Sequence, residues 1–225
     1  MKHSKKIFLS LALQTLVAPK CFSLPPHQQT ESKRLQIGVR VYNDAHVPDV
    51  QTRAAEEVVA RVLQHAGIEA EWSDCTVVGG MPRTDSPSCA APLHSRDLVV
   101  YFVDRLEAHF SCVDRNALGY SIIPDTRELA SMAYVSYSRI QHLSATTSTR
   151  AEDLLGLAVA HEIGHLLFGS NQHANQGIMR AKWRLRDLEA RAWDEFQFTE
   201  EQGKRLRAGV EMRRQADELR ATAQK

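Results

Sequence analysis

Apolar and polar positions along residues 35–140 follow patterns that predict a sheet with one long helix. Short runs rich in β-branched and aromatic residues predict five strands, at 35–42, 68–72, 97–103, 118–123 and 132–140. Between the first two, apolar residues recur every three or four positions from Pro48 until Gly67. That spacing predicts a helix. The positions expected to face the core are Ala54, Val58, Val59, Val62 and Leu63.

A second helix is predicted over about 150–168, where apolar residues occupy nearly every position. A helix that is apolar on all sides is normally buried. Thr149 and Glu152 have the spacing of a capping box, and Gly169 is the residue type that commonly ends a helix. A third helix is predicted from about 199 to 222, with Thr199 and Gln202 as its capping box.

The buried helix carries the chain's candidate chemistry, the sequence H-E-x-x-H formed by His161, Glu162 and His165. Residues four apart lie on the same face of a helix, so both imidazoles can bind one metal ion. Glu162, beside the first histidine, can reach a water on that ion. Because unpaired polar groups are costly in a core, we interpret this group as a zinc site rather than as packed core histidines.

A catalytic zinc ion usually has three protein ligands and a water. His173 lies in a polar stretch just beyond Gly169. A chain that reverses at Gly169 would bring His173 back to the metal. We therefore predict His161, His165 and His173 as the metal ligands.

The motif helix, the glycine turn, the third histidine and Gly177-Ile178-Met179-Arg180 together resemble the metzincin metallopeptidases. The spacing departs from the usual H-E-x-x-H-x-x-G-x-x-H, since Phe168 and Asn171 occupy the positions where that family has Gly and His. The resemblance implies a secreted zinc endopeptidase with Zn²⁺ as cofactor. In such an enzyme Glu162 is the general base toward zinc-activated water, and Met179 lies in the Met-turn.

The resemblance also implies the fold. It is an α/β (α+β) zincin-like domain with a twisted, mixed five-stranded sheet. The sheet packs on a long helix and the H-E-x-x-H helix, with a further helix at the C-terminus. Residues 119–122 would be its antiparallel edge strand, whose free backbone groups would pair with an extended peptide substrate.

Three other interpretations of the motif remain open. In the gluzincin arrangement the third ligand is a glutamate on a later helix, and Glu189 is the candidate. The protein could instead be a zinc amide hydrolase that acts on a small or cell-wall substrate. It could also be a non-catalytic zinc-binding domain, although such a domain would not need Glu162.

The N-terminus predicts export. Lysines at 2, 5 and 6 precede an apolar stretch too short to span a membrane, as in a signal peptide over 1–23. A linker at 24–34 and a single catalytic domain at 35–225 would follow. Without residues 1–23 the chain has 24 basic and 27 acidic residues, a net charge of −3. We therefore expect a secreted or periplasmic monomer that has a peptide or protein substrate, no nucleic-acid partner and no membrane span.

Cys75, Cys89 and Cys112 would remain after removal of the signal peptide. An exported protein with three cysteines is expected to form one disulfide. Both Cys75–Cys89, across a loop rich in Gly, Pro and Ser, and Cys89–Cys112 are compatible with the sequence.

Overall fold

The computed structural model of the chain describes residues 35–83, 86–111, 113–126, 128–190 and 192–223. These residues belong to one compact unit of the chain. The predicted signal peptide at 1–23 and linker at 24–34 lie outside the described residues.

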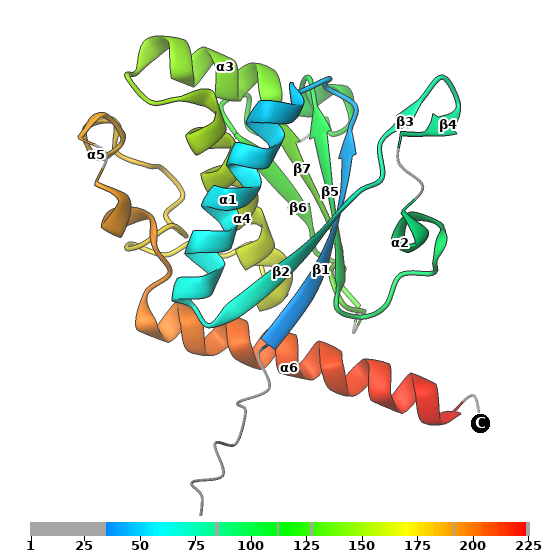
Figure 1. Cartoon of the computed structure of the whole chain (residues 1–225). Coiled ribbons are helices and arrows are strands. Elements are labelled where there is room, and N and C mark those ends of the chain that lie inside the picture. Colours follow the sequence, from blue (N-terminus) through cyan, green and yellow to red (C-terminus); the bar gives the residue numbers. More distant parts are fainter. Residues whose placement is uncertain (1–34, 84–85, 112, 127, 191, 224–225) are drawn as a thin grey trace, which may run out of the picture. The chain divides into compact units, whose positions relative to one another are not determined.

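A mixed five-stranded sheet forms the centre of the fold, as predicted (Figure 1). Its strands are β1 (Leu35–Asn43), β2 (Ile68–Asp74), β5 (Asp97–Val103), β6 (Gly119–Ile122) and β7 (Met132–Ser136). They lie in the order β2-β1-β5-β7-β6. All neighbours are parallel except β6, which runs antiparallel to β7 and forms one edge of the sheet. A separate hairpin joins β3 (Val77–Val78) and β4 (Met81–Pro82).

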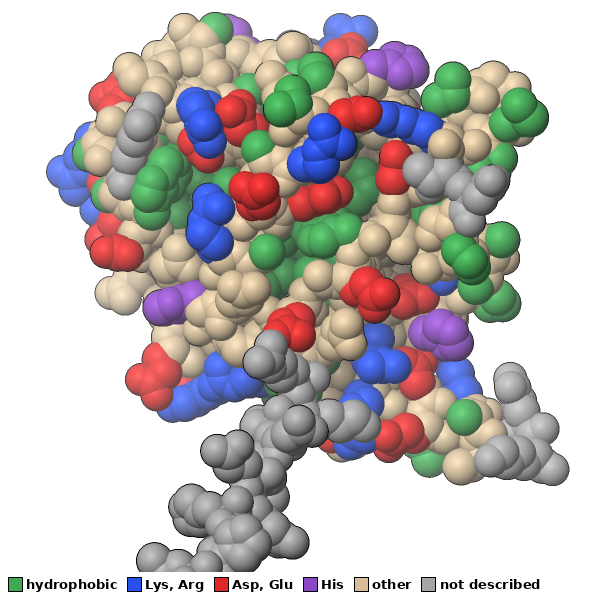
Figure 2. Space-filling model, in the orientation of Figure 1, with side chains coloured by type: hydrophobic (Ala, Val, Ile, Leu, Met, Phe, Trp, Pro, Cys, Tyr) green, Lys and Arg blue, Asp and Glu red, His purple; other side chains and the backbone are tan. Residues whose placement is uncertain are grey.

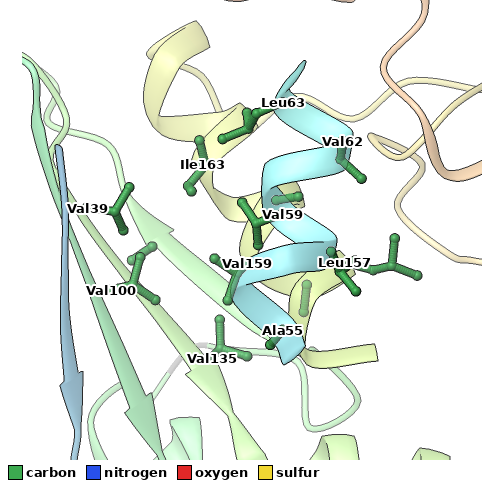
Figure 3. Close-up of a cluster of buried hydrophobic side chains, with 14 of the residues drawn as sticks. Val39, Ala55, Val59, Val62, Leu63, Val100, Val135, Leu157, Val159 and Ile163 are labelled. Carbon is green, nitrogen blue, oxygen red and sulfur yellow. The ribbon is translucent and has the colours of Figure 1, made fainter. Parts of the chain in front are cut away.

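Helices α1 (Asp49–His65) and α4 (Ala151–Phe168) cover one face of the sheet. Valines at alternate positions of the strands point toward both helices, among them Val39, Val100 and Val135 (Figure 3). The two helices cross closely at Gly156, where a Cβ atom would lie 2.5 Å from Cβ of Val58. The inner face of α1 carries Ala55 instead of the predicted Ala54. The result is a continuous core between sheet and helices.

The remaining described helices are short except for α6 (Glu200–Ala223), which crosses the end of α4. Gly209 of α6 lies so close to the carbonyl oxygen of Leu167 that no side chain would fit between the two helices. The shorter ones are α2 (Pro87–Ala90), α3 (Tyr137–Thr146), α5 (Leu185–Glu189) and the 3₁₀ helices η1 (Leu106–Ala108) and η2 (Trp193–Phe196).

The predicted strand at 132–140 is wrong in its second half. Strand β7 ends at Ser136, and α3 begins at Tyr137. The Ser136 hydroxyl accepts a hydrogen bond from the backbone N–H of Arg139 and so caps the first turn of the helix. This local bond overrides the alternation of Tyr and Ser that favoured a strand.

The capping box predicted at Thr149 is also wrong. Arg150 is the N-cap residue of α4 and caps it with no side-chain hydrogen bond, while the buried Thr149 hydroxyl has no partner among the described residues. Instead, the Arg150 guanidinium donates to Asp153 of the first turn at 3.0 Å. The acidic first turn is thus paired with a cation, in addition to lying at the positive end of the helix dipole.

The other helix boundaries follow the sequence closely. Gly169 ends α4 in the left-handed conformation, with φ 60° and ψ 35°. Thr199 and Gln202 form the predicted capping box before α6, because each backbone N–H is bonded to the side chain of the other residue. Gln202 also donates to the carbonyl of Gln176, which ties the start of α6 to the preceding loop.

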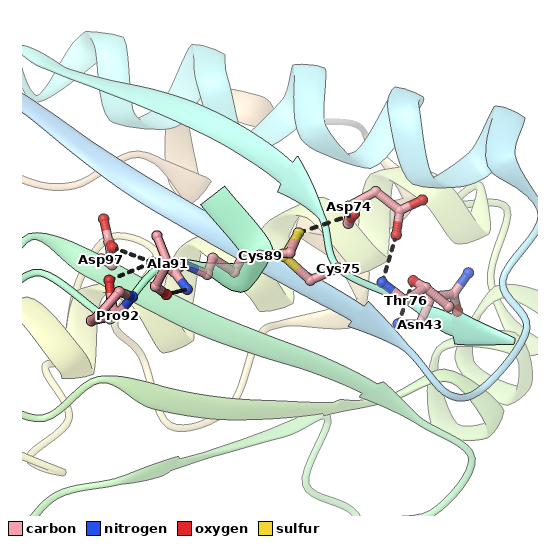
Figure 4. The surroundings of a disulfide bond; sticks show 9 residues. Asn43, Asp74, Cys75, Thr76, Cys89, Ala91, Pro92 and Asp97 are labelled. Carbon is pink, nitrogen blue, oxygen red and sulfur yellow. Dashed lines mark hydrogen bonds and ion pairs between the residues drawn. A yellow bond between two sulfur atoms is a disulfide. The ribbon is translucent and has the colours of Figure 1, made fainter. Parts of the chain in front are cut away.

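Cys75 and Cys89 form a disulfide at the end of β2 (Figure 4). The segment that follows Cys89 is held by Arg40 of β1. Its guanidinium donates to the carbonyls of Ala91 and Pro92 and pairs with Asp97. Cys112 lies outside the described residues.

Acidic and basic side chains are interspersed over the face shown in Figure 2, in keeping with the near-neutral net charge. No helix in the described ranges combines the length and the apolar character needed to cross a membrane.

Candidate metal centre

His161 and His165 lie one turn apart on α4, and both side chains are buried. Their Nε2 atoms are 3.0 Å apart. His173 approaches the same point from the loop after α4. One nitrogen of each of the three imidazoles lies within 4.8 Å of the others.

The turn after α4 brings His173 to this point. The backbone N–H of Ser170 bonds back to the carbonyl of His165, which reverses the chain directly after Gly169. Ala174 then pairs with the segment that contains Met179, its N–H donating to the Met179 carbonyl at 2.8 Å. His173 therefore faces the two helix histidines despite the longer spacing, although its own side chain is exposed.

Backbone carbonyls fix the orientation of both helix histidines. His161 Nδ1 lies 2.8 Å from the carbonyl oxygen of Ile178, and His165 Nδ1 lies 2.8 Å from that of Ser170. A carbonyl oxygen can only accept, so both Nδ1 atoms carry the hydrogen. The Nε2 atoms of His161 and His165, 3.0 Å apart, consequently both carry a lone pair.

The spacing of the two helix histidines fits a zinc ion. Two nitrogen ligands in a tetrahedral zinc site are about 3.3 Å apart, given Zn–N bonds of about 2.05 Å. The observed Nε2 separation of 3.0 Å is close to that value. Histidines that ligate metals commonly donate their other N–H to a carbonyl, as both do here.

Burial keeps the two helix imidazoles neutral. It lowers the pKa of His161 to about 3, with a smaller contribution from nearby His165, and it lowers the pKa of His165 to about 4. Burial also lowers the pKa of His173. Because only the neutral imidazole binds a metal, these three side chains are ready ligands at neutral pH.

Glu162, which follows His161 in the sequence, is buried, and its carboxyl is held by the edge strand. The Ser121 hydroxyl of β6 donates to Glu162 Oε2 at 2.6 Å. Burial raises the pKa of Glu162 to about 7, although the bond from Ser121 opposes this. A carboxyl with a pKa near neutrality can both take up and release a proton during a reaction.

The loop that carries Met179 packs against the part of α4 that carries the histidines. A Cβ atom at Gly164 would lie 2.6 Å from the Met179 sulfur, so the absence of a side chain there lets the loop pack directly on α4. The Trp183 indole N–H donates to the Ile178 carbonyl at 3.0 Å, the same oxygen that accepts from His161. The loop thereby supports the ring of His161.

Buried charges stabilise the far end of this loop. Arg180 pairs with Asp187 at 3.2 Å, donates to the Glu195 carbonyl and lies over the ring of Phe196. These contacts connect the loop to the segment that leads into α6.

Other candidate residues lie away from the histidines. Glu189, the alternative third ligand, is exposed at the end of α5 and is not part of the histidine group. The hydroxyl of Tyr137 donates to Gln51 of α1. Tyr120 packs on Phe110, and as the neighbour of Ser121 it lies on the other face of β6.

The sequence did not indicate Ser121, Trp183 or the two carbonyl acceptors. Ser121 lies on the expected edge strand, but nothing in the sequence gave it a role. Trp183 lies in a segment with no recognisable motif, and a backbone carbonyl has no sequence signature at all. The one available signal was the expectation that ligating histidines have partners.

In comparisons with known proteins, no protein-family model matches the chain, and no curated protein matches it significantly. Among solved structures, the chain is similar to an archaemetzincin from Methanopyrus kandleri, with 14% identity, a TM-score of 0.48 and coverage of 80% of this chain and 98% of the other. It is also similar to metalloproteinase-II from Bacteroides fragilis, with 12% identity, a TM-score of 0.43 and coverage of 73% of this chain and 53% of the other.

Proposed function

We propose that this chain is an exported zinc-dependent endopeptidase in which His161, His165 and His173 bind zinc and Glu162 is the general base. The observation that carries the proposal is the convergence of three imidazole nitrogens within 4.8 Å, with the buried Glu162 adjacent in sequence to one of these histidines. A purely structural zinc site is usually closed by four protein ligands. Here three histidines form the group found among the described residues, so a bound zinc ion would have a fourth coordination position for water or substrate.

When bound, zinc would supply Lewis acidity, which makes water a better nucleophile and polarises the scissile carbonyl. Glu162 would take a proton from the attacking water. The protonated carboxyl would then give this proton to the amide nitrogen as the C–N bond breaks, so that the carboxylate is restored.

A peptide substrate would bind along β6. This strand pairs with β7 on one side and is the last strand in the sheet order, so its other edge can pair with an extended chain. Ser121 on the same strand contacts Glu162. A peptide paired with β6 would therefore run past the general base and the histidines.

Export is part of the proposal. The predicted signal peptide at 1–23 supports it, and so does the disulfide between Cys75 and Cys89, since disulfides persist in oxidising compartments. N-terminal sequencing of the mature protein would test it. A mature protein that begins at Met1 would contradict export through a cleaved signal.

Digestion of casein or gelatin, with and without a chelator, tests the peptidase function. We expect hydrolysis that stops on chelation and returns with zinc. Glu162→Gln should keep zinc and lose about 10²–10⁴-fold in rate. Glu152→Gln, in the first turn of the same helix, is the matched control and should retain activity.

The alternative functions give different results in the same experiment. Hydrolysis of small amides or cell-wall peptides without digestion of protein would favour the amide hydrolase. Stoichiometric zinc without hydrolysis of any of these substrates would favour the binding domain.

A further inference from the structure

Gly119 and Ser121 occupy alternate positions of β6, so both lie on the strand face that points toward α4. The Glu162 side chain, from α4, lies against this face. Its Oε2 atom accepts from the Ser121 hydroxyl at 2.6 Å, and the same hydroxyl lies 3.1 Å from the Glu162 backbone carbonyl. Ser121 is 2% exposed and Glu162 is 5% exposed.

Gly119 provides the space for the carboxyl. A Cβ atom at this position would lie 2.5 Å from Oε1, 2.6 Å from Cγ and 2.7 Å from Cδ of Glu162. These distances are far below van der Waals contact, so any larger residue would displace the carboxyl. Gly119 therefore makes room for the group that Ser121 binds.

We propose that Gly119 and Ser121 form a seat that positions the carboxyl of Glu162 for proton transfer. The inference rests on the proposed role of Glu162 as general base. We call this pair the Gly119–Ser121 seat. Both are positioning residues that act through Glu162.

The seat lies on the strand along which we propose that the substrate binds. One short strand would then fix both the peptide main chain and the general base. The position of the carboxyl relative to the scissile bond would be set by β6 and would not depend on the conformation of a free side chain. This matters because a misplacement of about 1 Å can cost on the order of 10² in rate.

Substitution of Ser121 by alanine tests the positioning role. We expect kcat to fall about 10–100-fold, while KM stays within about 2-fold and zinc content is unchanged. Ser121→Thr keeps the hydroxyl and should restore most of the lost rate. A kcat within about 2-fold of wild type in the folded, zinc-loaded Ser121→Ala protein would overturn the proposal.

Ser136→Ala is the matched control. Ser136 is also a buried serine, on the neighbouring strand β7, but it donates to the Asp104 carbonyl and does not contact Glu162. This variant should lose stability with little change in kcat. An equal loss of kcat in both variants would show that the loss in Ser121→Ala is a general consequence of destabilising the sheet. That result would overturn the proposed positioning of Glu162.

Gly119→Ala tests the other half of the seat. The added Cβ should displace the carboxyl, so that kcat falls at least 10-fold while zinc is retained. Unchanged kcat in this variant would show that the carboxyl needs no such space.

A double-mutant cycle tests the seat without any assay of activity. The melting temperatures of Ser121→Ala, Glu162→Ala and the double variant should be non-additive by about 2 °C or more, since the two side chains share one buried hydrogen bond. Additive changes would overturn the seat whether or not the protein hydrolyses peptides. A coupled cycle in a protein that hydrolyses no substrate would support the seat and contradict only the proposed function.

Discussion

The Nδ1 atom of His161 lies 2.8 Å from the carbonyl oxygen of Ile178, 17 residues later in the chain. This bond determines which nitrogen of the imidazole is free to bind a metal. It also joins α4 to the loop that carries Met179. The loop is therefore part of the candidate metal centre.

Trp183 should support this bond, because its indole N–H donates to the same carbonyl at 3.0 Å. Trp183→Phe keeps most of the ring and removes the donor. We expect zinc affinity to fall about 10-fold, at the low end of the effects found for residues that orient ligands. Competition with a chromogenic chelator measures the affinity.

The matched control is Trp193→Phe, since Trp193 packs on the ring of Phe196, as Trp183 does. It should leave zinc affinity within about 2-fold of wild type. Equal losses in both variants would show that ring packing, and not the indole donor, supports the site.

Arg213 should be among the most important residues for stability. It is 1% exposed and donates to the carbonyls of Ser95, Ala130 and Leu166, which lie in three different segments. Arg213→Met would remove these three buried hydrogen bonds, although the Leu166 carbonyl would keep its bond from the Gly169 N–H. We expect a loss of about 3 kcal/mol in the free energy of unfolding, measured by urea denaturation.

Arg214 provides the comparison at the adjacent position. Its guanidinium pairs with Glu211 and Glu218 on the surface of α6. Arg214→Met should cost much less stability than Arg213→Met, because an exposed ion pair is screened by solvent. Similar losses for the two arginines would contradict the structural role assigned to Arg213.

Glu56 should make stability depend on pH. It lines a pocket of about 340 Å³ between α1 and β2, and burial, together with nearby Asp74, raises its pKa to about 7. The folded state therefore holds a proton that the unfolded state releases near pH 4.5. The contribution of Glu56 to the free energy of unfolding should fall as pH rises from about 4.5 to about 7, and should be constant outside this range.

Glu56→Gln should remove that contribution. At pH 8 the variant should be more stable than wild type by about 1 kcal/mol, after allowance for the solvent access of the carboxyl. Below about pH 4 the difference should vanish. Glu57→Gln, on the exposed side of α1, should keep the wild-type profile. A wild-type profile in Glu56→Gln would show that this carboxyl is not perturbed.

The disulfide should stabilise the fold without affecting the metal centre. It closes a loop between Cys75 and Cys89, 14 residues apart, at the end of β2, while β6 lies at the opposite edge of the sheet. Cys89→Ser should lower the free energy of unfolding by about 3 kcal/mol. Zinc content should be unchanged, and loss of zinc in the folded variant would contradict this separation.

The elements predicted correctly are those with strong local signals. Helix α4 has an uninterrupted apolar run and a terminal glycine, so its bounds agree with the sequence to within one residue at each end. The same local reasoning placed His161, Glu162 and His165 on one helix. His173 could be placed beside them because Gly169 forces the chain to reverse.

The errors occur where a local pattern competes with a tertiary contact or with a second local bond. The hydroxyl of Ser136 starts a helix inside a sequence that alternates like a strand. Thr149 has the spacing of a helix cap, but its side chain is buried against the fold and Arg150 takes the capping position. Neither outcome is encoded in spacing alone.

Contacts between distant segments were not accessible from the sequence. From the sequence, Gly156 is only a residue that disfavours a helix. The fold shows that Val58 of α1 occupies the space that a side chain at position 156 would need. Ser121 gains its importance from the position of β6 beside α4. Such residues become visible only once the elements are placed in three dimensions.

We propose that His173 completes a three-histidine zinc site. The most direct test is the zinc content of purified His173→Ala and Glu189→Ala, measured by atomic emission after dialysis against a weak chelator. We expect about one zinc per chain in wild type and in Glu189→Ala, and loss of most of the zinc in His173→Ala. Retention of zinc in His173→Ala together with its loss in Glu189→Ala would rule out His173 and assign the third ligand to Glu189.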